Sequence, residues 1–425
     1  MEPLSLVLCS YSYRLGDGIA HVDANLITSL DPTLFKVKAF VLRPDFPPGH
    51  RERTDISLHV SLADAFDLLS EELAGADVLH VNGPFDPVAC NAAAARGVPG
   101  IVEVVHQMEP GGLHPAVDAL VCVSERVRSI QLREDAVTIT NGIDTERFSF
   151  KPGRRDAEQV RVVQVANACK ALYRELGDVA AELDEPRLVP FMAGDRPARP
   201  GVPSLGVRRD MPAVYHDADL LFLLEVDGAF GLVFAEALAC GTLPIVSGDS
   251  GGASMVRHGE TGWIVPADNM AKAADVLSEA AAAVRSPHFP AMQRKGREIA
   301  VSRYGKPRML AQYQALYARL GNRPRKAPEA PPAWMHLSLF AQLFRFGNPA
   351  ALDVLERYIT EPRPLEAYYA RHPMGQAAIT FVLRDACPAL VSQGYGRLVR
   401  PLCMRLHRSR IQSPLLDAAE ALAAR

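Results

Sequence analysis

Short apolar runs alternate with longer amphipathic segments along the first three quarters of the chain. A first series covers residues 4–10, 36–42, 76–82, 100–106 and 118–124, and a second covers 159–167, 187–194, 203–207, 218–224, 242–248 and 262–266. Strands that helices cover on both faces read as continuous apolar runs, so this alternation is typical of doubly wound parallel sheets. We therefore predict an α/β protein with two Rossmann-like domains in tandem and a cleft between them.

Two breaks in this pattern divide the chain. Residues 150–158, FKPGRRDAE, read as a linker, and residues 321–333, GNRPRKAPEAPPA, are rich in proline. A helical stretch around 288–320 closes the second series, and the segment after the proline-rich break carries only amphipathic helical runs. We predict an N-terminal domain over residues 1–150, a C-terminal domain over 151–320 and a helical extension over 334–425.

Composition narrows the classes of partner and compartment. The 425 residues carry a formal net charge of -3, which gives no basic surplus to attract nucleic acid. The seven cysteines are scattered without a C-x-x-C pair, as expected of reduced thiols in a cytoplasmic protein. No stretch has the ~18 uninterrupted apolar residues of a membrane span, which leaves room for peripheral membrane contact only.

Ligands of open parallel sheets bind beyond the carboxyl ends of the strands, so the loops at that edge hold the candidate site residues. Gly18 precedes a helix after the first strand, where close backbone approach to an anion is possible, although such turns also occur without ligands. His106 ends another strand, and a packed loop histidine is its structural alternative. Lys170 and Arg208 follow strand ends of the second series and are candidates for phosphate or base contacts.

The strongest candidate is the stretch VDGAFGLVFAEALACG, residues 226–241. A buried strand ends just before it, a glycine-containing turn follows, and a helix begins near Leu232. The free amides and positive dipole end of such a helix favour a diphosphate. Glu236, one turn in, is a candidate for binding ribose hydroxyls, or simply an acid of the kind that the first helical turns favour. A second glycine-rich turn, SGDSGG at 247–252, should lie beside the first.

Asp217 and Asp219 resemble a metal-binding pair. They precede their strand, at the edge of the sheet opposite the cleft, so we reject them as metal ligands.

With these residues assembled, the chain resembles the family-four retaining glycosyltransferases of the GT-B fold. The resemblance covers about residues 4–320 and excludes the extension. It is carried by these segments: GDGIAHVDANL, ADVLHVNGP, VEVVHQ, VDALVCVSERVRS, ITNGIDTERF, SLGVRRDMPAVYHDADLLFLL, FGLVFAEALACGTLPIVSG and VRHGETGWIVP.

The resemblance implies transfer of a sugar from a nucleotide-sugar donor to an acceptor, with retention of configuration and without a catalytic metal or a further cofactor. The N-terminal domain would hold the acceptor, a glycan, a lipid-linked sugar or a small molecule of the kind used in polysaccharide biosynthesis, and the C-terminal domain would hold the donor. Gly18 would approach the diphosphate and His106 the transferred sugar. Val207 and Arg208 would border the base. The donor would also meet these residues: Lys170, Phe230, Gly231, Leu232 and Glu236.

Three positions depart from the family pattern. An acid is expected eight residues before Glu236, where the chain has Gly228, and either Asp227 or Glu225 could supply it; we take Asp227 as the catalytic candidate. Asn167 stands where an arginine is expected to grip the diphosphate, and Ser254 stands near a missing acid.

These departures leave two functional hypotheses. The first is an active transferase with an atypical donor site. The alternative is a catalytically inactive relative that acts as a binding or scaffold protein, with the helical extension mediating assembly into oligomers. A dinucleotide-binding dehydrogenase is disfavoured, because the first turn, LGDGIAHV, lacks the full G-x-G-x-x-G spacing.

Overall fold

A computed structural model describes the chain in a set of segments, and the account below concerns these alone. They are residues 2–10, 18–41, 55–58, 69–82, 86–108, 110–112, 114–151, 158–167, 170–197, 199–226, 228–328, 336–337, 340–341, 344, 351–360, 373–411 and 413–423.

The first sheet consists of parallel strands in the order β3-β2-β1-β4-β5-β6-β7. Every residue of the central strands β4 and β5 is buried, which explains their unbroken apolar character. The strands are β1 (Leu4–Ser10), β2 (Phe35–Val41), β3 (Asp55–Leu58), β4 (Val78–Asn82), β5 (Gly100–Val105), β6 (Ala119–Cys122) and β7 (Val137–Thr138). The helices of this domain include α1 (Gly18–Ser29), α3 (Asp86–Ala95) and α4 (Glu125–Ser129).

The second sheet has the order β10-β8-β11-β12-β13, all parallel, and the short β9 pairs antiparallel with the end of β11. Its strands are β8 (Val160–Val165), β9 (Leu172–Arg174), β10 (Leu188–Ala193), β11 (Leu220–Glu225), β12 (Leu243–Ser247) and β13 (Trp263–Val265). The helical elements are α5 (Leu176–Leu183), α6 (Met211–His216), α7 (Leu232–Cys240), η3 (Gly251–Met255), η4 (Met270–Lys272) and α8 (Ala273–Val284).

The predicted class, two doubly wound parallel sheets and a helical extension, is confirmed. One predicted strand is wrong: residues 203–207 contribute a single bridge, between Met192 and Ser204, because Gly206 turns the backbone to a φ of 67°. The pattern also missed β3 and β9, which have four and three residues and are too short to show a period.

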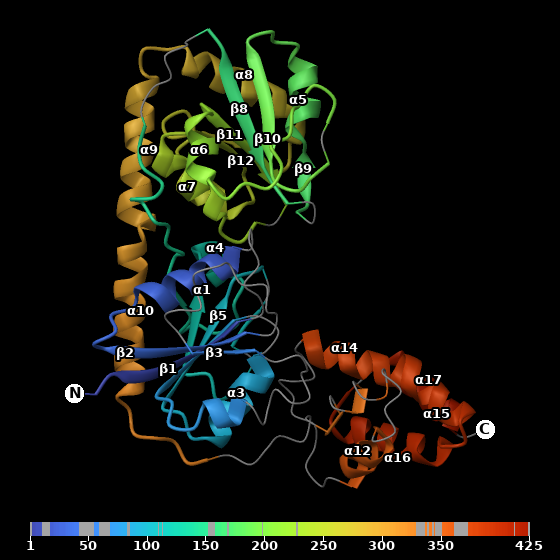
Figure 1. Ribbon diagram of the computed structural model, residues 1–425. Helices are drawn as coiled ribbons and strands as arrows, with labels where there is room; N and C mark the ends of the chain where they lie inside the picture. Colours follow the sequence, from blue (N-terminus) through green and yellow to red (C-terminus); the bar gives the residue numbers. More distant parts are fainter. Residues whose placement is uncertain are drawn as a thin grey trace.

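Two consecutive helices run along one side of the molecule and connect the second sheet to the first (Figure 1). The first, α9 (Phe289–Tyr304), packs against α7, and the second, α10 (Lys306–Gly321), packs against β4 and β5. The chain bends between them at Gly305, where the Ile143 N–H donates to the Tyr304 carbonyl at 2.8 Å. The predicted second range, 151–320, therefore ends in a helix that packs on the first sheet.

The extension is built from α12 (Ala351–Thr360), α14 (Pro373–Phe381), the π-helix η5 (Val382–Ala386), α15 (Cys387–Ser392), α16 (Gly396–Arg408) and α17 (Pro414–Ala423). It lies beside the first domain (Figure 1), and its apolar side chains belong to one continuous core with β1, β4 and α3. No helix in the described part of the chain is long and apolar enough to cross a membrane. The described cysteines, Cys9, Cys90, Cys122, Cys240, Cys387 and Cys403, are buried and form no disulfide with one another.

Candidate functional site

Helices that follow the carboxyl ends of the strands meet at the junction of the two domains, where α1 and α4 of the first domain lie next to α7 of the second (Figure 1). A Cβ atom placed on Gly18, the first residue of α1, would lie 3.3 Å from Cδ1 of Leu232, the first residue of α7. The Ser124 hydroxyl donates to the Ala229 carbonyl at 2.6 Å. Gly18 therefore lies beside the start of α7, and its predicted approach to a diphosphate stays a prediction.

The turn before α7 presents a set of backbone donors to this junction. Gly231 has a φ of 87°, a conformation that favours glycine, and directs the chain into the helix. Within the described residues, no protein acceptor is hydrogen-bonded to the N–H groups of Phe230, Gly231, Leu232 and Val233. Such free amides at a helix N-terminus favour an anion.

The second glycine-rich turn packs directly against the first, as predicted. The Gly251 N–H donates to the Gly228 carbonyl at 2.6 Å, and a Cβ on Gly251 would lie 2.6 Å from the Ala229 carbonyl oxygen. Phe230 is buried, and its ring meets that of Tyr304 edge to face with a centroid separation of 5.7 Å. The Phe230 side chain is thus committed to the core, and its backbone alone is left for a ligand.

An ion pair with a buried carboxylate occupies the point of the second sheet where the strand order reverses, between β8 and β11. Lys170 follows β8, and its ammonium contacts Oε2 of Glu225, the last residue of β11. The Glu225 carboxylate is 2% exposed and the Lys170 side chain 34%. The other carboxylate oxygen, Oε1 of Glu225, is buried and has no hydrogen-bond partner within the described part of the chain. Ligands of open α/β sheets bind at this switch point.

The geometry explains why residue 228 is a glycine. A Cβ on Gly228 would lie 2.0 Å from Oε1 of Glu225, and one on Gly231 would lie 3.3 Å from the same oxygen. The carboxylate from the strand end thus fills the space that a side chain at position 228 would need. Of the two acids that the sequence offered as substitutes, Glu225 reaches this turn, and Asp227 lies outside the described residues.

Arg196, which sequence reasoning missed, holds the loop that carries Lys170. Its guanidinium donates to the carbonyls of Asn167 at 3.1 Å and Lys170 at 2.6 Å, and to the Glu175 carboxylate at 2.6 Å. Its only signal in the sequence is its place shortly after a buried strand, β10. The family pattern places an arginine at position 167 of this loop. Arg196 holds the loop in place, but its guanidinium donors are bonded to protein acceptors.

Glu236 lies on the partly exposed side of α7, where its Oε2 accepts a hydrogen bond from the Tyr215 hydroxyl at 2.9 Å. Desolvation raises the pKa of Glu236 to about 7, against the opposing effects of the Tyr215 hydrogen bond and the positive charge of Arg147. This carboxyl therefore changes charge near neutral pH, which the sequence did not predict.

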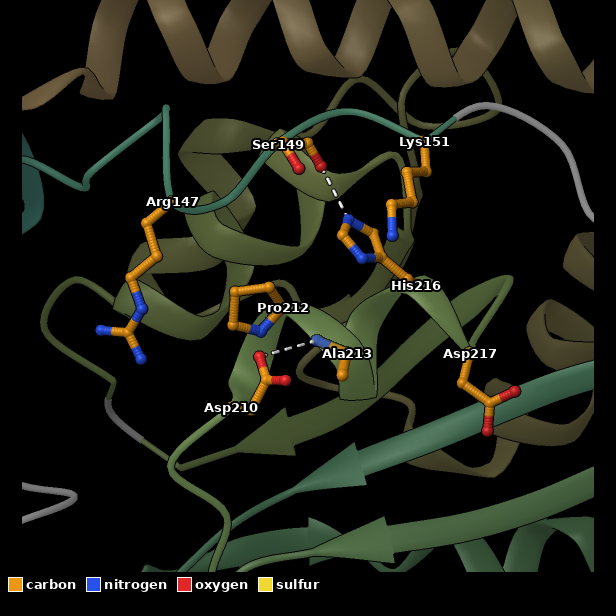
Figure 2. Close-up of a pocket in the computed structure, with 8 residues that line it drawn as sticks. All are labelled: Arg147, Ser149, Lys151, Asp210, Pro212, Ala213, His216 and Asp217. Carbon is orange, nitrogen blue, oxygen red and sulfur yellow. Dashed lines mark hydrogen bonds between the residues drawn. The ribbon is translucent and has the colours of Figure 1, made fainter.

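The two residues predicted to border the base, Val207 and Arg208, are exposed on the loop before α6. Within the described residues, no hydrogen bond or ion pair joins them to Glu236, whose partner is Tyr215. A polar groove of about 410 Å³ lies along α6 instead (Figure 2), between that helix and the segment that leaves the first domain. Arg147 and Lys151 line one side and His216 the other, with the His216 ring against the Ser149 carbonyl at 2.7 Å.

His106 directly follows β5 at the carboxyl edge of the first sheet, and its ring is half-buried. Its Nε2 is 3.2 Å from Oδ1 of Asn82, the last residue of β4. Burial and the neighbouring His80 ring lower the pKa of His106 to about 3, so the ring is neutral at pH 7. A neutral imidazole can exchange hydrogen bonds with a ligand but supplies no charge to a diphosphate.

The rejected acidic pair has a structural role at the opposite edge of the second sheet. Asp219 accepts a hydrogen bond from the Arg161 N–H at 2.8 Å, and Asp217 forms an ion pair with the Arg161 guanidinium. Both residues precede β11, as the sequence predicted.

A comparison with known families matches residues 202–284, which span α6, α7 and both glycine-rich turns, to the model described as "Glycosyl transferases group 1". The resemblance inferred from the sequence is confirmed over this segment. No curated protein matches the chain in sequence.

Solved structures share the fold of the two-sheet part. A glycosyltransferase from Rickettsia africae is similar with a TM-score of 0.64 at 13% identity, over 76% of this chain and 100% of that one. HepE from Anabaena, solved with UDP, is similar with a TM-score of 0.62 at 15% identity, over 75% of this chain and 100% of its own. WaaB, a galactosyltransferase of the lipopolysaccharide outer core, has a TM-score of 0.58 at 12% identity, over 74% and 99%. The chain therefore has the GT-B fold.

Proposed function

We propose that this protein, with its GT-B fold and its segment that matches the group 1 glycosyl transferases, transfers a sugar from a nucleoside diphosphate sugar to an acceptor. One observation carries the proposal. The Lys170–Glu225 pair stands at the switch point of the second sheet, beside the free amides of α7 and across from Gly18. This arrangement offers donors for a diphosphate and an acceptor for sugar hydroxyls within one junction.

The donor would occupy three subsites of this junction. The diphosphate would bind the amides of Gly231 and Leu232, where the helix dipole also favours negative charge. Sugar hydroxyls would donate to Oε1 of Glu225, which has no partner within the described residues. Ribose hydroxyls would donate to Glu236. The HepE structures with UDP and with UDP-glucose make UDP-glucose the first donor to test.

The chemistry follows from the position of these groups. Negative charge grows on the diphosphate as the bond to the sugar breaks, and fixed amides at that point stabilise the transition state more than the ground state. We propose retention of configuration because the chain resembles retaining glycosyltransferases. We propose a step without a metal ion because the amides and Lys170 supply the positive groups. Asp227 remains a proposed catalytic residue, while the geometry described above rests on Glu225.

The acceptor would lie in the first domain, near His106, and we propose that it is lipid-linked. The support is the composition of the extension: residues 334–425 contain eleven arginines and seven acids, in a chain of net charge -3. The exposed side of α16 carries basic residues around a 45% exposed methionine, a pattern suited to an anionic lipid surface. These residues are Arg397, Arg400, Met404, His407 and Arg408.

Sedimentation with vesicles tests this contact. The intact protein should bind vesicles that contain anionic phospholipid more than neutral ones, and Arg397→Glu with Arg400→Glu should remove the difference. Equal binding to both kinds of vesicle would refute the contact but leave the transferase proposal standing.

The inactive binding or scaffold protein is the second candidate. The ion pair between Lys170 and Glu225 favours this candidate, because a lysine bound to a carboxylate is not free to bind a diphosphate. Release of nucleoside diphosphate from UDP-, GDP-, ADP- and dTDP-sugars separates the two candidates. The transferase should release one of these diphosphates, and more slowly as the Glu225→Ala variant. Tight donor binding without release, with every acceptor tried, would support the scaffold instead.

A further inference from the structure

A buried polar cluster lies directly below the carboxyl edge of the first sheet. It joins Asp23 of α1, His80 and Asn82 of β4, Tyr317 of α10 and His106 after β5. The first four are 0–1% exposed, and they include a histidine and a carboxyl group. Buried polar groups of this kind constrain one another's hydrogen atoms, because each donor needs an acceptor.

The orientation of the Asn82 amide follows from its neighbours. Nδ2 of Asn82 is 2.6 Å from Oδ1 of Asp23 and donates to that carboxylate. Oδ1 of Asn82 therefore faces the other way, where it lies 3.1 Å from Nε2 of His80 and 3.2 Å from Nε2 of His106. An amide oxygen only accepts hydrogen bonds, so both Nε2 atoms must carry a proton.

The remaining ring nitrogens are then acceptors, because burial keeps both rings neutral at pH 7. It lowers the pKa of His80 to about 4 and that of His106 to about 3. Nδ1 of His80 accepts from the Tyr317 hydroxyl at 2.6 Å. Within the described residues, Asn82 is the one hydrogen-bond partner of the His106 ring, so Nδ1 of His106 is left to accept from a ligand.

We propose that Asn82, held by Asp23, is a positioning residue that fixes His106 as the tautomer protonated on Nε2, with Nδ1 presented to a ligand hydroxyl. The inference rests on the proposed transferase function for the identity of that hydroxyl, which would belong to the bound sugar. The proposed tautomer itself follows from the cluster alone. His106 would thus accept a hydrogen bond from the substrate and would not donate a proton to it.

A mirror arrangement gives the opposite tautomer and defines what would overturn the proposal. If the Asp23 carboxyl were protonated and the Asn82 amide reversed, the amide NH₂ would donate to both histidines, and each ring would carry its proton on Nδ1. That arrangement needs a protonated aspartate at pH 7, about three pH units above the ordinary pKa of the group. The two arrangements differ at every ring nitrogen, so one spectrum distinguishes them.

Nitrogen NMR of the full chain labelled with ¹⁵N-histidine reads these nitrogens directly. The chain has 12 histidines, and the variants His80→Gln and His106→Gln identify the two signals. At pH 7 both rings should be neutral with the proton on Nε2. A proton on Nδ1 of His106, or a doubly protonated ring, would overturn the proposal whether or not the protein transfers sugar.

Asn82→Ala tests the positioning role. We expect kcat/KM to fall about tenfold, with the Kd for the nucleoside diphosphate unchanged, because the amide holds the ring and not the donor. The His106 Nε2–H signal should shift as it loses its acceptor. A merely structural role would lower stability but leave kcat/KM unchanged.

Asn25→Ala is the matched control. Asn25 lies on the same helix as Asp23, and its amide donates to the Gly142 carbonyl at 3.4 Å. The variant should change neither the His106 signal nor kcat/KM. Absence of transfer by the wild-type protein, together with the predicted tautomer, would refute the proposed function and keep the positioning inference.

Discussion

Replacing Gly228 with alanine tests whether the Glu225 carboxylate is the reason for a glycine at this position. The added Cβ would lie 2.0 Å from Oε1, 2.3 Å from Cδ and 2.8 Å from Cγ of Glu225. The carboxylate is the end of a flexible side chain and can rotate, but it is 2% exposed and would leave Lys170. The substitution must therefore displace a buried charged group.

The expected cost is that of overpacking a closed site. Such insertions destabilise by about 1–3 kcal/mol, and we expect about 2 kcal/mol here. A change of 1 kcal/mol shifts the melting temperature of a domain of this size by about 2–4 °C, so Gly228→Ala should lower it by about 4–8 °C. Removing the carboxylate first, with Glu225→Ala, should reduce the cost of the alanine to less than about 0.5 kcal/mol.

Differential scanning calorimetry on the four proteins of this double-mutant cycle gives the answer. Gly248→Ala, in the neighbouring turn, is the control, because its Cβ would meet no described atom closer than 3.4 Å. An equal loss of stability for Gly228→Ala with and without Glu225 would refute the reasoning. The glycine would then be required by the backbone and not by the carboxylate.

The remaining predictions concern the charge of Glu236, the loop held by Arg196 and the extension. The pKa of Glu236 is about 7, and only its ionised form accepts two ribose hydrogen bonds, so donor affinity measured by calorimetry should rise about tenfold from pH 6 to pH 8. The Glu236→Gln variant should bind the donor equally at both pH values, and a pH dependence that survives in this variant would exclude the assignment. Arg196→Ala should weaken binding of the nucleoside diphosphate at least fivefold, because it releases the loop that carries Lys170. Arg208→Ala, at an exposed position, should weaken binding less. A larger loss for Arg208→Ala than for Arg196→Ala would indicate that Arg208 binds the phosphates. Removal of residues 334–425 should cause aggregation, seen by light scattering, because the extension shares a core with the first domain; a monodisperse truncated protein would contradict this.

The sequence was sufficient for the sheets because their strands are buried on both faces. Runs such as residues 218–224 admit few other interpretations, and the turn with the helix beginning at Leu232 follows from glycine and helix-forming residues that are adjacent in the chain. The path of α10 could not be predicted, since an amphipathic pattern shows that a helix face is buried but not what covers it. Only the structure shows that this face lies on the first sheet.

The same limit applies to the candidate site. Position 228 could be recognised as unusual, and Glu225 was one of two acids near it, but the choice needed the direction of a side chain at a strand end. Arg196 is 29 residues from the carbonyl of Asn167 that it binds, and Asn82 is 59 residues from Asp23. Contacts over such separations leave no local pattern in the sequence.

The position of the diphosphate is the most direct test of the account. A crystal structure with the nucleoside diphosphate that the release assay identifies would show it. We predict that its phosphates lie at the amides of Gly231 and Leu232, with Glu225 free of direct phosphate contact. Phosphates bound in the groove along α6, against Arg147 and Lys151, would contradict the account.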